Sequence, residues 1–284
     1  MRRLNDQFLA DLNGGFLAPI LDYVRGDRDI ILEIRLNAIN LYFKGNSLLK
    51  LSQIRDGTYK ATIHPTLSGG VHIPDPIRQS PEVASIAAIL PKVREAILNL
   101  RGSGSEIEYE QMIIRANNRE SRLATDFLMV DRQICMPGEE GRFDLTGLYL
   151  PRRVWHRTKT AALALIETKF GLNPDIAEIH DQLSGYYRAL ANHLSDVAET
   201  TQMILRQKVK LGLISHGEDR LRAYQDLKVS ANISDVRFVI ALVDYAPESK
   251  LLNEAAINAL PFRDQIDIFH LGFGLWQSNA VPRN

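Results

Sequence analysis

The chain lacks the features that would place it outside the cell or in a membrane. It has a single cysteine, Cys135, in 284 residues, which excludes an intrachain disulfide framework. Its longest apolar runs, 160–166 and 238–243, are the length of a strand and too short to span a bilayer. The first six residues also lack the apolar stretch of a secretory signal. We therefore expect a cytoplasmic protein with no membrane partner.

The sequence also has no net charge and none of the common nucleotide motifs. Its 34 basic residues balance its 34 acidic ones, so any contact with nucleic acid must be local. There is no phosphate-binding Gly-x-x-x-x-Gly-Lys loop, no dinucleotide fingerprint and no Gly-x-Ser-x-Gly elbow. These absences argue against a motor, a dinucleotide-dependent enzyme or an esterase of the elbow type.

What the sequence does contain is a charged pair at the end of an apolar strand. Residues 163–170 read Leu-Ala-Leu-Ile-Glu-Thr-Lys-Phe. Because strand side chains alternate between faces, Glu167 and Lys169 should project together. Charges so close to a core strand are costly unless they pair with each other, a metal or a substrate. The pattern indicates a functional site, although a lone Glu-x-Lys is also typical of an ion pair across one face of a strand.

Turn signals divide the chain into two predicted parts. Residues 4–25 have the pattern of an amphipathic helix, and 30–64 read as strands broken by Lys-Gly-Asn and Arg-Asp-Gly turns, which predicts an antiparallel meander. A helix over about 81–100 precedes Arg-Gly-Ser-Gly-Ser, the best linker candidate. We therefore predict an accessory α+β region over 1–101 and a second domain over 105–284.

The second part predicts a helix, three strands, helices and further strands. The first helix covers 105–118 and begins with a Ser105/Glu108 capping box. The strands are expected at 126–136, 141–150 and 162–170, the first two joined by the turn at 137–141. Helices over 173–193 and 195–213 and strands at 236–243 and 266–272 complete the list.

This order resembles the core of the PD-(D/E)XK nuclease superfamily over residues 105–245. Asp144 lies 23 residues before Glu167 and matches the family aspartate, with Phe143 where the family has proline. Glu167 and Lys169 match the acidic-x-Lys pair. Gln182 and Tyr186, in Gln-Leu-Ser-Gly-Tyr, match the Gln-Leu-x-x-Tyr helix signature of the RecB-like branch. The resemblance implies an α/β fold with a restriction-endonuclease-like mixed central sheet flanked by helices.

The resemblance also implies an acidic residue on the first core helix. Glu108 and Glu110 both stand on that helix, about 200° apart around its axis, so one of them at most can face the site. We favour Glu110, alongside Asp144 and Glu167, as a ligand of Mg²⁺ or Mn²⁺. Carboxylates hold such hard cations, which neutralise the charge that grows during phosphodiester hydrolysis. Lys169 would orient the attacking water and Gln182 would hold a ligand in place.

A basic segment joins the two strands that carry Asp144 and Glu167. Residues 142–169 hold six basic and two acidic side chains. Arg152, Arg153 and Arg157 are expected to contact phosphates close to the site, with Tyr186 as a further nucleic-acid contact, although a solvated hairpin loop has the same composition.

These observations favour an Mg²⁺-dependent nuclease acting on DNA in restriction, repair or defence. One alternative is a non-catalytic nucleic-acid-binding protein that retains the fold. Another makes the N-terminal region an oligomerisation or protein-interaction module, giving a homodimer or a partner protein.

Overall fold

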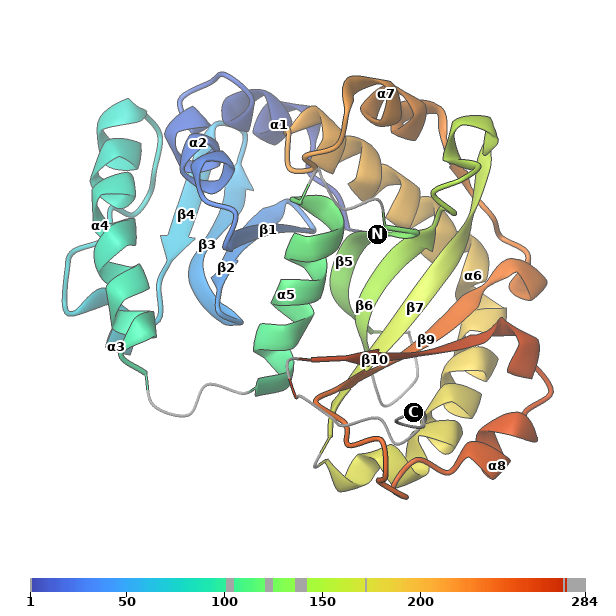
Figure 1. Ribbon diagram of the computed structural model, residues 1–284. Coiled ribbons are helices and arrows are strands. Elements are labelled where there is room, and N and C mark those ends of the chain that lie inside the picture. The colour runs from blue at the N-terminus through green and yellow to red at the C-terminus, as the bar shows by residue number, and fades with distance from the viewer. Residues whose placement is uncertain are drawn as a thin grey trace, which may run out of the picture.

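The computed structural model describes residues 2–100, 105–120, 125–135, 142–171, 173–272 and 274. Residues 101–104 of the linker predicted at 101–105 and the predicted turn at 137–141 lie outside these residues, as does the side chain of Cys135. The fold is mixed α/β, with an antiparallel four-stranded sheet and a mixed six-stranded sheet flanked by helices (Figure 1). In the described part, no helix is long and apolar enough to cross a membrane.

The N-terminal sheet is the predicted meander, which is confirmed. Its order is β1-β2-β3-β4, and left-handed backbone at Lys44, Gly45 and Gly57 closes two of its turns. The single helix predicted over 4–25 is wrong, because the first helix ends at Leu12 and Gly14 has a φ of 141°, which is not helical. The elements are α1 (Asp6–Leu12), α2 (Ala18–Gly26), β1 (Ile30–Arg35), β2 (Ala38–Phe43), β3 (Asn46–Arg55), β4 (Thr58–Thr62), α3 (Pro65–Ser68) and α4 (Ser80–Leu98).

The second sheet has the order β10-β9-β7-β6-β5. Strands β5, β6 and β7 are antiparallel neighbours, whereas β7, β9 and β10 run parallel, and the short β8 pairs with the start of β7. The elements are α5 (Ser105–Asn118), β5 (Phe127–Cys135), β6 (Arg142–Tyr149), η1 (Trp155–Arg157), β7 (Thr160–Phe170), η2 (Pro174–Glu178), α6 (Ile179–Lys210), α7 (Glu218–Asp226), β8 (Lys228–Val229), η3 (Ile233–Asp235), β9 (Arg237–Val243), α8 (Glu254–Asn258), η4 (Arg263–Gln265) and β10 (Ile266–Leu271).

Helix α6 replaces the two helices predicted over 173–193 and 195–213. A single helix of 32 residues follows a 3-10 turn that begins at Pro174. Its buried side chains continue without interruption through Leu190, Leu194 and Val197, so the apolar stripe passes the expected break at Ser195. The sequence signals at 193–195 were therefore outweighed by packing against the sheet.

Alternate side chains of β7 enter different cores. Leu163 and Leu165 pack with α6 residues, whereas Ala164 and Ile166 pack with Ile114 of α5. The strand is therefore covered on both faces, which explains its nearly continuous apolar sequence.

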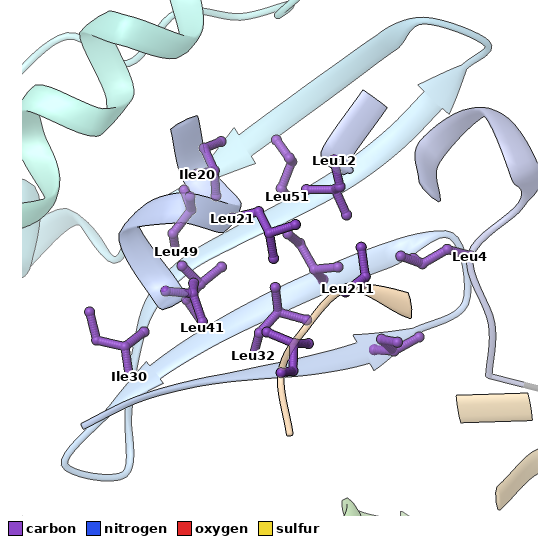
Figure 2. Packing of buried hydrophobic residues seen from close by; sticks show 14 of the residues in the cluster. Leu4, Leu12, Ile20, Leu21, Ile30, Leu32, Leu41, Leu49, Leu51 and Leu211 are labelled. Carbon is purple, nitrogen blue, oxygen red and sulfur yellow. The ribbon is translucent and has the colours of Figure 1, made fainter. Parts of the chain in front are cut away.

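One hydrophobic cluster crosses the predicted domain boundary. Figure 2 shows Leu211, which follows α6, among side chains of the N-terminal sheet such as Leu32 and Leu41. Nearby, Lys208 of α6 donates to Glu33 of β1 at 2.8 Å, and both side chains are buried. The N-terminal region thus shares its core with the second sheet. Its role as an interaction module stays a prediction.

Candidate functional site

The site is built where β6 and β7 separate. Their ladder begins at Leu145 opposite Ile166, so Asp144, one residue beyond it, stands across from Glu167. Residues opposite each other in an antiparallel pair project from the same face. Asp144 Oδ2 accepts a hydrogen bond from the backbone N–H of Thr168 at 2.8 Å, in the position a ladder bond would otherwise take. The two carboxylates therefore lie at the same end of the sheet, and the charge of Asp144 acts on Glu167.

Lys169 lies two residues further along β7, on the face of Glu167, as the alternation predicts. Its Nζ is 2.8 Å from Glu167 Oε1, and both side chains are largely buried. Such a pair in a low-dielectric setting is held more tightly than an ion pair on the surface. The pair fixes the lysine at the end of the strand.

The start of α6 completes this side of the site. Gln182 Nε2 donates to Glu167 Oε1 at 2.7 Å and also to the hydroxyl of Tyr186, one turn further along. The Tyr186 hydroxyl donates its proton to the carbonyl of Arg142 at 2.9 Å, while its ring packs on Phe143 with centroids 4.0 Å apart. The predicted Gln-Leu-x-x-Tyr residues thus connect the helix to both strands, and Tyr186 is buried rather than presented to a partner.

Burial dominates the electrostatics of the two carboxylates. Burial, followed by the charge of Asp144, raises the pKa of Glu167 to about 7, against the opposing effect of Lys169. Burial likewise raises the pKa of Asp144, partly offset by the Thr168 N–H and by Lys169. Burial acts against the Lys169 ammonium, but the charge and hydrogen bond of Glu167, together with the charges of Asp144 and Glu106, outweigh it and raise the pKa of Lys169. Lys169 is therefore a cation at neutral pH and no proton acceptor.

Glu106, on the first turn of α5, is a neighbour that the sequence interpretation missed. Its Oε1 accepts from the Asn173 side chain at 2.7 Å and from the Phe170 N–H at 3.3 Å. Its charge raises the pKa of both Asp144 and Lys169. Glu106 stands four residues before Glu110, about 40° away around the helix, so the i, i+4 spacing was a usable signal.

The two glutamates weighed in the sequence go to different places. Glu108 Oε1 lies 3.7 Å from the Nζ of Lys44 in the N-terminal meander. Glu110 is buried and accepts from Arg132 Nη2 at 2.8 Å, and the Arg132 guanidinium stacks on Tyr42 at 4.5 Å. Burial raises the pKa of Glu110 to about 7, and the charge of Asp144 adds to the rise. Glu110 is therefore buried with its carboxylate engaged by Arg132, and its role as a metal ligand stays a prediction.

The donor set suits a hard cation that keeps several of its waters. Within the described ranges, no group of three or more His, Cys, Asp and Glu side chains is placed to enclose a metal ion. Mg²⁺, however, is commonly held by one or two carboxylates plus water and substrate oxygens. Asp144 and Glu167 provide two such carboxylates, and a positive charge beside them would oppose the burial that raises the pKa of both. The residues present fit such an ion.

The basic loop does not lie beside this site, which corrects the predicted position. Arg152, Arg153 and Arg157 follow the end of β6 and precede β7, whereas Asp144 lies near the start of β6 and Glu167 near the end of β7. At about 3.3 Å per strand residue, the loop is roughly 20 Å from the carboxylates. Figure 1 shows this hairpin end close to α7, away from the start of α6. Adjacency in sequence placed the arginines at the wrong end of two long strands.

Comparison of the chain with protein-family models, with curated proteins and with solved structures finds no match. The geometry of the chain's own residues is therefore the basis for a functional assignment.

Proposed function

We propose that this protein is an Mg²⁺-dependent nuclease that hydrolyses phosphodiester bonds of DNA, on a fold of the restriction-endonuclease type. The observation that carries the proposal is the convergence of Asp144, Glu167 and Lys169 where β6 and β7 separate, with Gln182 bonded to Glu167. The mixed sheet between α5 and α6 and the resemblance in the motifs support the same assignment.

Each residue has a role that follows from its contacts. The ion, when bound, would neutralise charge on the phosphoryl oxygens and favour a nucleophilic water. Asp144 and Glu167 would hold it, and the Thr168 N–H orients the Asp144 carboxylate. Gln182 keeps Glu167 in position through its amide N–H. Lys169, being protonated, donates from Nζ to the attacking water or to a phosphoryl oxygen, and so orients rather than deprotonates.

The test is cleavage by the purified chain with and without a divalent ion. Supercoiled and linear DNA are incubated with Mg²⁺ or Mn²⁺, and in parallel with chelator. We expect cutting that requires the ion, and a loss of at least about a hundredfold in Lys169→Ala, on the order of 3 kcal/mol of transition-state stabilisation. Lys210→Ala, which removes an exposed lysine at the end of α6, is the matched control and should cut normally.

Circular dichroism and thermal unfolding of Lys169→Ala separate chemistry from folding. Cutting in chelator, or full activity of a folded Lys169→Ala, would remove the catalytic assignment.

One observation favours the non-catalytic alternative. Glu167 Oε1 already accepts from both Lys169 and Gln182, so the protein satisfies that oxygen without an ion. Calorimetric titration with Mn²⁺ distinguishes the two: a nuclease should bind the ion and lose that binding in Asp144→Asn, whereas a protein that merely retains the fold should give no heat in either form.

A further inference from the structure

The end of the β6–β7 hairpin opposite the carboxylates carries a cluster of exposed cations. These are Arg152, Arg153, Arg157, Lys159 and Lys228, called here the hairpin-end cations. The backbone of β8 brings Lys228 to the loop, since the Lys228 N–H donates to the carbonyl of Lys159 at 3.0 Å and Lys228 pairs with Thr160. Two segments about 70 residues apart in sequence therefore present one surface.

The side chains of the hairpin-end cations do not hold the described structure together. All five are exposed, and no carboxylate of the described residues lies within ion-pair distance of any of them. By contrast, most buried or half-buried arginines of this chain are paired, such as Arg132 with Glu110 and Arg35 with Asp131. Unpaired surface cations are free to meet an external polyanion without first breaking an internal contact.

The loop itself is held by other groups. The Arg152 backbone N–H donates to Asp126 Oδ1 at 2.6 Å, and the Arg157 N–H donates to the carbonyl of Val154 at 2.9 Å. Arg220 of α7 stacks over Trp155 at 5.5 Å. The loop shape therefore depends on backbone bonds and on Trp155, so the charged side chains are presented on a preorganised support.

We propose that the hairpin-end cations form a second docking surface for the phosphate backbone of duplex nucleic acid, roughly 20 Å from the scissile bond. This inference rests on the proposed nuclease function and adds a substrate class, a duplex long enough to reach both ends of β6 and β7. A duplex is favoured over a single strand because its stiffness keeps a fixed span between two contacts. At 3.4 Å per base pair the separation corresponds to about six base pairs on that side of the cut.

The test is binding as a function of duplex length, with cutting silenced by Glu167→Gln in every protein. Duplexes from about 6 to about 24 base pairs are titrated at several salt concentrations. The test variant is Arg152→Ala/Arg153→Ala/Arg157→Ala. The control variant is Lys50→Ala/Arg55→Ala/Lys92→Ala, which removes the same charge from exposed positions on β3 and α4.

We expect affinity to rise with length until the duplex spans both ends of the hairpin. The test variant should lose on the order of tenfold or more for long duplexes at low salt, and its salt slope should fall by about two to three. Short duplexes should bind the background protein and the test variant alike. The control variant should follow the background protein throughout, because its charges lie on β3 and α4 of the N-terminal region.

An equal length dependence and salt slope in the test and control variants would overturn the proposal. If the test variant loses binding to polyglutamate but keeps its duplex binding, the proposal is overturned in favour of an acidic protein partner. If the test variant loses as much affinity for single strands as for duplexes, the duplex assignment is overturned. Cleavage by the chain with Glu167 restored is read separately. If the chain does not cut but the test variant loses duplex affinity in a length-dependent way, only the nuclease assignment fails. If the chain cuts normally but the test variant shows no such loss of affinity, only the docking surface fails.

Discussion

The two ends of the β6–β7 hairpin carry charge in opposite ways. At one end Glu167 and Lys169 are buried and paired, Asp144 is half-buried, and burial raises the pKa of both carboxylates. At the other end the arginines are exposed and have no ion-pair partner among the described residues. Buried charges are held in fixed geometry at a cost in desolvation, which suits chemistry. Exposed charges cost little and act over several ångströms, which suits attraction of a polyanion.

The largest expected effect is at the buried end. Asp144→Asn keeps the size of the side chain and its capacity to accept the Thr168 N–H, but removes the negative charge. We expect cleavage to fall at least about a hundredfold in single-turnover assays, on the order of 3 kcal/mol, with a folded protein. Arg153→Ala, at the exposed end, should leave the single-turnover rate at saturating substrate unchanged. Equal losses in both variants would erase the contrast between the ends.

A smaller loss is expected from the residue that positions Glu167. Gln182→Ala removes a hydrogen bond to a charged group, and such a bond contributes roughly 1.5–3 kcal/mol. We therefore expect about a tenfold or greater decrease in cleavage rate, with more Mn²⁺ needed for half-maximal activity. Gln202→Ala, which removes a bond between α6 and β8, is the control on the same helix. A metal requirement identical to that of the unchanged protein would mean that Gln182 does not position Glu167.

The pH dependence of stability separates the ends in another way. Burial raises the folded-state pKa of Glu110 and of Glu167 to about 7 each, above their value of 4.5 in the unfolded chain. The folded state then holds protons that the unfolded state releases. The stability these groups contribute is full below about pH 4.5 and is lost as pH rises through about 7, by at most about 1.4 kcal/mol per pH unit for each group.

The measurement is urea unfolding in chelator between about pH 5 and about pH 7.5. Glu167→Gln should flatten the decline, because it removes one of the titrating groups. Arg152→Ala/Arg153→Ala/Arg157→Ala should retain the slope of the unchanged protein. A slope that is indifferent to Glu167→Gln would show that the buried end is not strained by its own charge.

The smallest expected effect is that of one cation at the exposed end. Lys228→Ala should lower the salt slope of duplex binding by about one and weaken binding a few-fold at low salt. Unfolding should shift by less than about 0.5 kcal/mol, as is usual for an exposed side chain without a partner. A change in the single-turnover cleavage rate would contradict the separation of the two ends.

Local patterns in the sequence predicted much of the fold and part of the site. The meander, the helix over 105–118 and the strands around Glu167 were expected from turns and alternation, and these signals act over a few residues. The error at α6 arose because Ser195 and its neighbours resemble a helix boundary, while a continuous buried stripe holds the helix together. The projection of Glu167 and Lys169 from one face follows from strand geometry alone.

The tertiary structure determined which side chains lie next to one another. The register of β6 on β7 places Asp144 across from Glu167, and the rotation of α5 brings Glu106 to the site while turning Glu110 to Arg132. The same antiparallel pairing carries the basic loop to the far end of the hairpin. Register, helix rotation and strand length depend on contacts between residues far apart in the chain, and the net effect of many such contacts cannot be read from a short window of sequence.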